Sequence, residues 1–146
     1  MSKLDLSKLS DFVDKWWDDS ALPSLCEFVE IPALSPSFDS DWEANGYLDA
    51  AVNTFVAWVR SLPLEGLTVS VHRLKNRSPV LLVRIDGEAD GEVLFYSHLD
   101  KQPEAEGWSE GKGPWKPVIE DGWLFGRGSV DDGYGGYAGV FSLLAL

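Results

Sequence analysis

The stretch Val93-Leu94-Phe95-Tyr96-Ser97-His98-Leu99-Asp100 is an apolar run that changes abruptly into polar residues. A continuous apolar run predicts a strand that is buried on both faces, as in the centre of a sheet covered by helices. Side chains alternate along a strand, so His98 and Asp100 are expected to point to the same side. Because a carboxylate often holds the ring of a metal-binding histidine, this strand end is a candidate metal site.

A second acidic feature lies further along the chain, where Asp131 and Asp132 follow Gly126-Arg127-Gly128-Ser129-Val130. Asp131 could supply a carboxylate oxygen as a further metal ligand. Alternatively, the pair could begin a helix, since acidic side chains suit the free backbone donors and the dipole of a helix N-terminus. The two interpretations are compatible for Asp131, and the residues alone leave both open.

Periodicity outlines the elements around these two features. Apolar residues at helical spacing predict helices over residues 5–18, 20–30, 40–60 and 137–146. Period-two alternation and apolar runs predict strands over residues 67–73, 79–85, 92–97 and 123–125. The polar turn 86–91 is expected to join its two flanking strands in a hairpin, and residues 101–121 are expected to form a long loop.

Individual residues indicate where the predicted helices begin, end or are interrupted. Ser20 is expected to cap the second helix, with Pro23 in the first turn, where no backbone donor is needed. Gly46 is the weakest point of the third helix, so the first turn there is expected to be separate. The last helix reaches Leu146 without a glycine or a polar stop signal, from which we expect the chain to be the N-terminal part of something longer.

The remaining histidine and the single cysteine are expected to be structural. His72 falls on the polar face of its strand with Thr68 and Ser70, so a solvated side chain is expected. Cys26 has no partner for an internal disulfide and lies at helical spacing among apolar residues. It is expected to be a small buried hydrophobic residue.

Composition narrows the class of protein. The 146 residues are 45% hydrophobic and 25% charged, which predicts one globular domain. The net charge of −12 argues against nucleic acid as a partner and is compatible with a site that concentrates cations. Charges are scattered through the first twenty residues, with no apolar run long enough for a signal peptide or a membrane span, so we expect a cytoplasmic protein with no membrane partner.

Two other motifs are weaker. Gly133-Tyr134-Gly135-Gly136-Tyr137-Ala138 loosely matches the Gly-x-Gly-x-x-Gly/Ala pattern of dinucleotide-binding turns. The two aspartates that precede it would repel a pyrophosphate, however. Ser129 lacks the Gly-x-Ser-x-Gly context of a nucleophilic serine. Neither motif is expected to be functional.

Several elements follow His98 in a fixed order. They are His98-Leu99-Asp100, Pro103, Gly107-Trp108, Gly113-Pro114-Trp115-Lys116-Pro117, Asp121-Gly122, Leu124-Phe125-Gly126-Arg127-Gly128 and Asp131-Asp132. Together they resemble the N-terminal signature of the M20 family of zinc metallopeptidases, which includes carboxypeptidases, aminoacylases, amino-acid deacylases and carnosinase-like dipeptidases. The helical N-terminus and the first strands also suit this family, and Lys101-Gln102-Pro103 is most similar to its dipeptidases.

The resemblance implies an α/β class and a three-layer α/β/α zinc-peptidase-like catalytic domain. Residues 1–146 would be the N-terminal portion of that domain. The dimerisation domain that the family inserts into its catalytic domain, and the C-terminal part of the catalytic domain, are not among these residues. For the complete protein the resemblance implies a homodimer.

The resemblance also implies the residues of the site. By its motif, His98 would bind one of two zinc ions and Asp131 would bridge both, with cobalt or manganese as substitutes for zinc. Asp100 would be the catalytic residue that orients the His98 ring, and the peptide bond between Asp131 and Asp132 would be cis. The implied reaction is hydrolysis of an amide or peptide bond, in a small peptide or an N-acyl amino acid, by a zinc-activated water.

The sequence departs from the family pattern in ways that leave other hypotheses open. The family's general base, the first of a Glu-Glu pair, and its remaining ligands lie further downstream, so this chain is expected to be inactive alone. Gly133-Tyr134 stands where the family often has Lys-Gly. One rival hypothesis is a non-catalytic module of the same fold that binds a partner or a single metal. Another is a small α/β protein in which His98 and Asp131 are structural.

Overall fold

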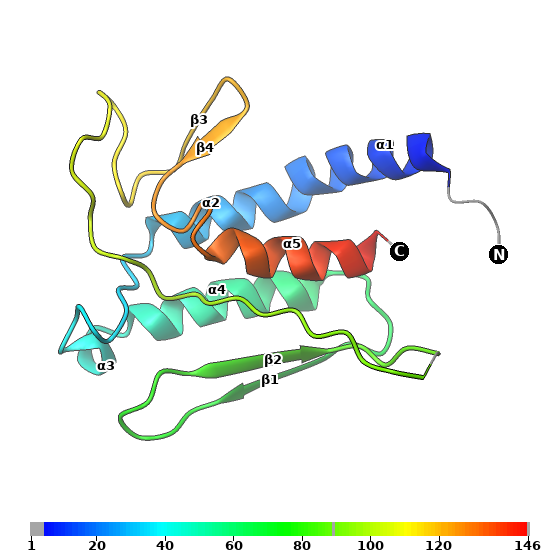
Figure 1. Cartoon of the computed structure of the whole chain (residues 1–146), viewed down its shortest axis with the longest axis horizontal. Helices are drawn as coiled ribbons and strands as arrows, with labels where there is room; N and C mark the ends of the chain where they lie inside the picture. Colours follow the sequence, from blue (N-terminus) through cyan, green and yellow to red (C-terminus); the bar gives the residue numbers. More distant parts are fainter. Residues whose placement is uncertain (1–4, 89, 146) are drawn as a thin grey trace.

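A layer of helices and two small antiparallel hairpins make up the fold, which a computed structural model describes for residues 5–88 and 90–145 (Figure 1). The helical elements are α1 (Leu6–Trp16), the π-helical turn η1 (Trp17–Ala21), α2 (Leu22–Glu30), α3 (Trp42–Asn45), α4 (Tyr47–Ser61) and α5 (Gly133–Leu144). The strands are β1 (Thr68–His72), β2 (Val80–Arg84), β3 (Val118–Glu120) and β4 (Trp123–Phe125). The predicted mixed α/β class is therefore confirmed.

The core lies where α2, α4 and α5 meet. Tyr137 of α5 is fully buried, with its ring centroid 4.9 Å from that of Phe55 and 4.6 Å from that of Trp58, both on α4. Its hydroxyl lies 3.0 Å from both the hydroxyl and the backbone carbonyl of Ser24 on α2. A buried phenol needs such partners for its polar atom, so this contact fixes how the three helices pack.

The helices largely follow the predicted ranges, with differences at their ends. The first two predicted helices run together through η1, and Ser20 is not an N-cap, because its hydroxyl accepts a hydrogen bond from the Trp58 indole at 3.1 Å. Gly46 separates α3 from α4 with a φ of 71°, which confirms the predicted weak point. The last helix begins at Gly133, earlier than predicted.

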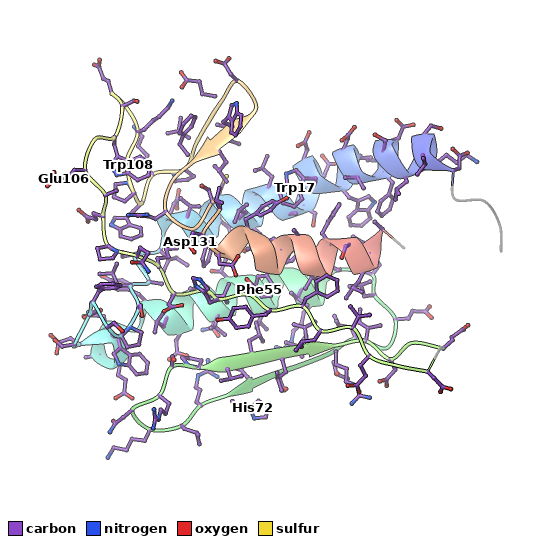
Figure 2. The ribbon with its side chains drawn as sticks, viewed as in Figure 1. Trp17, Phe55, His72, Glu106, Trp108 and Asp131 are labelled. Atoms are coloured by element: carbon purple, nitrogen blue, oxygen red, sulfur yellow. The ribbon has the colours of Figure 1, made fainter. Side chains whose placement is uncertain are left out.

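The predicted hairpin between residues 79–85 and 92–97 is wrong. β2 pairs instead with β1, in antiparallel register from Thr68 opposite Arg84 to His72 opposite Val80. These two strands have matching alternation, and a short polar loop joins them, so local pairing needs no distant partner. His72 is exposed on β1, as predicted, and Figure 2 shows it on the outer side of the hairpin.

The predicted buried strand over residues 92–97 is also not formed. This segment runs as an extended trace between α5 and the hairpin (Figure 1), yet Val93, Leu94 and Tyr96 are 84%, 91% and 82% exposed. An apolar strand is buried only when neighbouring strands and helices cover it, and the described residues supply no strand beside this one. The three-layer arrangement thus stays a prediction.

None of the helices in the described ranges has both the length and the apolar character needed to cross a membrane.

Candidate metal centre

The site is built where the extended segment meets the turn before α5. The Ser97 hydroxyl donates to the backbone carbonyl of Asp132 at 3.0 Å, and the His98 amide donates to the Asp132 carboxylate at 3.2 Å. These two bonds fix the backbone of the segment against the turn that carries Asp131, at the N-terminal end of α5 (Figure 2). Two parts of the chain that are distant in sequence are thereby held together.

The His98 ring lies between two carboxylates. Its Nδ1 is 3.1 Å from Oδ1 of Asp100 and 3.0 Å from the Asp100 backbone carbonyl. Its Nε2 is 3.4 Å from Oδ1 of Asp131. The side chains of His98 and Asp100 are 34% and 32% exposed, and that of Asp131 is 63% exposed, so the site is open to solvent on the Asp131 side.

These contacts assign the tautomer of neutral His98. Two acceptors face Nδ1, so Nδ1 carries the proton and donates it. Nε2 is then an unprotonated nitrogen whose lone pair faces the Asp131 carboxylate. A proton or a cation that lies between these two electron-pair donors would interact favourably with both of them.

The separation of these donors fits a zinc site. Zinc bonds of 2.0–2.1 Å to nitrogen and oxygen in a tetrahedron place neighbouring ligand atoms about 3.3 Å apart. The Nε2 to Oδ1 distance of 3.4 Å is close to that value. No group of three or more His, Cys, Asp or Glu side chains that could hold a metal ion occurs among the described residues, however. His98 and Asp131 are thus a pair of donors, one short of the three protein ligands of a catalytic zinc site.

Asp132 holds the backbone of His98 close to Asp131. Its peptide bond to Asp131 is cis, as the resemblance implies. Asp132 occupies the N-cap position of α5, but its side chain makes no capping bond and accepts from the His98 amide instead. The alternative in which this carboxylate caps the helix is therefore wrong. A Cβ atom at Gly135 would lie 2.5 Å from Oδ1 of Asp132, so a larger residue there would displace this carboxylate.

The glycines around Asp131 serve close packing. A Cβ atom at Gly133 would lie 2.1 Å from the Phe28 ring, and one at Gly136 would lie 3.2 Å from the Phe55 ring. Backbone that lies directly against aromatic rings cannot also cradle a pyrophosphate. Ser129 donates to the Gly126 carbonyl at 2.8 Å within the turn. The residues of both weaker motifs therefore make packing contacts or hydrogen bonds within this fold.

One residue near the site was missed by the sequence analysis. Lys101 follows Asp100 and is only 1% exposed, the one fully buried charged side chain among the described residues. Its Nζ donates to the carbonyls of Phe28, Val29 and Ile31 at 2.6, 3.2 and 2.7 Å. Burial lowers the pKa of Lys101 to about 7. Lysine is almost never fully buried without partners. The three carbonyls that bind Lys101 lie about seventy residues earlier in the chain, so the sequence around Lys101 does not predict this contact.

His98 and Asp131 thus face each other across a gap of 3.4 Å, with Asp100 on the other ring nitrogen of His98. Residues 94–146 match the family model of Peptidase family M20/M25/M40. This match confirms the M20 resemblance that the ordered motif elements indicate, and it includes every residue assigned to the site.

Proteins similar to this chain include three from microorganisms. An uncharacterized metallohydrolase of Methanocaldococcus jannaschii is 27% identical over 132 residues, which are 88% of this chain and 31% of the relative. A succinyl-diaminopimelate desuccinylase of Zymomonas mobilis is 42% identical over 73 residues, covering 47% of this chain and 19% of the relative. One from Acidiphilium cryptum is 40% identical over 68 residues, covering 47% and 18%. The chain thus spans less than a third of each relative.

Proposed function

We propose that residues 1–146 are part of the catalytic domain of a metal-dependent hydrolase that cleaves an amide or peptide bond. The observation that carries this proposal is the 3.4 Å separation between Nε2 of His98 and Oδ1 of Asp131, with Asp100 on the other ring nitrogen. The family match over residues 94–146 supports it independently.

Each residue has a distinct role in this proposal. His98 binds one zinc ion through Nε2, and Asp131 bridges two zinc ions through its carboxylate. The backbone carbonyl of Asp100 accepts a hydrogen bond from Nδ1, and its carboxylate lies 3.1 Å from the same nitrogen, so Asp100 would keep the ring turned toward the metal while Asp132 holds the His98 backbone in place. Bound zinc, or cobalt or manganese in its place, would polarise the substrate carbonyl and acidify a water molecule.

The proposed substrate is a small peptide or an N-acyl amino acid. Two relatives are named for removing the succinyl group of succinyl-diaminopimelate, which is an N-acyl amino acid. Because this chain spans only 19% and 18% of those relatives, the general base and the remaining ligands are proposed to lie in regions that these 146 residues do not cover. We further propose a three-layer α/β/α domain, a homodimer and a cytoplasmic location for the complete protein, and no activity for these residues alone.

A second candidate is a non-catalytic module of the same fold that binds a single metal or a partner. The observation that favours it is the small number of ligands, because His98 and Asp131 are two donors where a catalytic zinc ion has three protein ligands. The two candidates agree on metal binding at His98. They differ in whether the complete protein, with its downstream residues, hydrolyses N-acyl amino acids.

Zinc binding tests the shared part of both candidates. We expect the parent chain to bind zinc in a competition titration with a chromophoric chelator, and the variants H98A and D131A to lose that binding. H72A is the matched control, because His72 is the other histidine of the chain and is exposed on β1. Equal zinc binding by the parent chain and H98A would contradict the proposed site.

A further inference from the structure

Lys101 connects the site to the end of helix α2 through its backbone as well as its side chain. The Lys101 amide donates to the Ala33 carbonyl at 2.8 Å, and the Ser35 amide donates to the Lys101 carbonyl at 3.0 Å. With the three bonds of Nζ, Lys101 makes five hydrogen bonds to the segment from Phe28 to Ser35. Because Lys101 directly follows Asp100, these bonds also fix the residue that faces Nδ1 of His98.

The side chain of Lys101 also faces the turn that carries Asp131, which we name the aspartate loop (residues 126–132). A Cβ atom at Gly128 would lie 2.9 Å from Cε of Lys101 and 2.6 Å from the Phe28 ring. The Lys101 Nζ lies 4.1 Å from the centroid of that same ring. The lysine stem and the Phe28 ring therefore form the surface on which the aspartate loop rests.

Two roles are compatible with these contacts. The last carbonyls of a helix have no partner within the helix, so a buried lysine that binds them is a C-terminal cap that stabilises α2. A cap alone would affect the stability of the chain and leave the His98 ring as it is. However, the same side chain supports both halves of the site, since Asp100 precedes it and the aspartate loop packs on it.

We propose that Lys101 is a positioning residue of the metal site. It holds Asp100 and the aspartate loop against one rigid surface, the end of α2, and thereby sets the orientation of the His98 ring relative to Asp131. The role of His98 in this proposal rests on the proposed function, whereas the orientation of its ring can be measured without metal.

The orientation can be read from the imidazole tautomer. With Nδ1 held against two acceptors of Asp100, neutral His98 should be the Nδ1-protonated form, which the nitrogen chemical shifts of the ring distinguish from the other tautomer. We expect one fixed tautomer in the parent chain at pH 8 and a mixture of both in K101M. His72 gives an internal reference in the same spectrum, because the chain has only two histidines.

A matched control separates positioning from stability. V59A removes part of a fully buried side chain of α4, so it lowers the stability of the fold without touching the site. We expect V59A to keep the parent tautomer of His98. A K101M spectrum identical to that of the parent chain would overturn the proposal, and so would a mixture of tautomers in the parent chain itself.

A second pair of variants decides the question if K101M does not fold. K101R keeps a charged donor and is expected to retain most of the fixed tautomer. K101Q keeps a polar group on a shorter stem that cannot reach all three carbonyls, so it is expected to lose the fixed tautomer. Equal tautomer populations in K101R and K101Q would overturn the proposal.

Zinc titration of the same variants tests the proposed function separately. We expect zinc affinity to fall at least tenfold in K101M and to stay unchanged in V59A. A parent chain that binds no zinc would contradict the proposed function while the tautomer result still decides the role of Lys101. Unchanged zinc affinity in a K101M chain with mixed tautomers would show that ring orientation does not control metal binding, which would overturn the link to the site.

Discussion

We expect Asp100 to act on the proposed metal site only through the His98 ring, because its carboxylate faces Nδ1 at 3.1 Å while Nε2 faces Asp131. D100A removes one acceptor and leaves the Asp100 backbone carbonyl as the other. Loss of such an indirect partner typically weakens metal binding about ten- to a hundredfold. We therefore expect zinc affinity to fall by that factor in D100A, measured by chelator competition. Loss of all binding, as expected for H98A, would instead indicate that Asp100 is itself a ligand.

The charge of Lys101 makes stability depend on pH. Burial lowers the pKa of Lys101 to about 7, whereas an unfolded chain has a lysine pKa near the ordinary 10.5. Between pH 7 and 10 the unfolded chain therefore binds more protons than the folded chain, so the free energy of unfolding should rise with pH. A full difference of one proton corresponds to about 1.4 kcal/mol per pH unit, and the three carbonyls that favour the charged form reduce this slope.

Denaturant unfolding of the parent chain and K101M at several pH values measures this contribution. K101M has no group that titrates at this position, so the difference in the free energy of unfolding between the two proteins should grow from pH 7 to pH 9.5 in favour of the parent chain. If the free energies of unfolding of the parent chain and K101M change with pH in parallel, the pKa of Lys101 is the same in the folded and unfolded chains.

Two glycines of helix α5 differ in whether the space around them can hold a Cβ atom. A Cβ atom at Gly133 would lie 2.1 Å from the Phe28 ring, whereas one at Gly139 would meet Phe95 at an ordinary 3.6 Å. We expect G133A to lower the free energy of unfolding by about 1–3 kcal/mol through overpacking. G139A should raise it by about 0.5–1 kcal/mol, because alanine is the better helix former.

Urea unfolding of the parent chain, G133A and G139A measures whether the free energy of unfolding falls in the first variant and rises in the second. G87A is a useful control, since a Cβ atom there meets nothing within 4 Å. Equal effects of G133A and G139A would show that the close approach of Gly133 to Phe28 does not constrain the backbone.

We expect the exposed apolar segment before His98 to favour self-association. Leu94 and Tyr96 are 91% and 82% exposed, and the segment has no strand beside it among the described residues. Such an edge is a site of aggregation. We expect the double variant L94K/Y96K to scatter less light at high concentration and to bind less of a hydrophobic dye than the parent chain.

A lysine on another exposed strand controls for the added charge. Leu82 of β2 is 54% exposed within a paired strand, so L82K should change dye binding less than L94K/Y96K does. Equal reductions in the two proteins would attribute the effect to charge alone.

The same segment shows where prediction from the sequence succeeds and where it fails. Local patterns predicted the positions of β1 and β2, but residues 79–85 were predicted to pair with 92–97, whereas β2 pairs with β1 across a short loop. The apolar run 93–96 predicted burial, which depends on elements that must come from elsewhere in the fold. Local patterns therefore define elements, and distant partners decide which of them are covered.

The site could be predicted to a similar extent. The motif predicted that His98, Asp100 and Asp131 lie together, and the structure places Asp100 3.1 Å and Asp131 3.4 Å from the His98 ring nitrogens. Their roles in metal binding stay predictions. Lys101 was not found, since its three partners lie at the end of a helix far away in sequence. Even the position of Asp132 before α5 was misleading, because its carboxylate turns to the His98 amide and leaves the helix uncapped.

The whole molecule has 24 acidic and 12 basic side chains, so any divalent cation would reduce repulsion within it. Specific zinc binding must therefore be separated from this general effect. The two proposed ligands are brought together only by the folded chain, so zinc should bind the folded state preferentially and raise its stability. At about one hundred times the dissociation constant, one such site raises the free energy of unfolding by about 2.7 kcal/mol.

Thermal unfolding of the parent chain and H98A, each with zinc or with the same concentration of magnesium, separates the two effects. Magnesium reports the general reduction of repulsion, because it prefers oxygen ligands and should act equally on both proteins. Zinc should stabilise the parent chain beyond magnesium and should lose that excess in H98A. If zinc and magnesium stabilise both proteins alike, acidic charge explains all of the cation binding, and the hypothesis in which His98 and Asp131 are only structural is favoured.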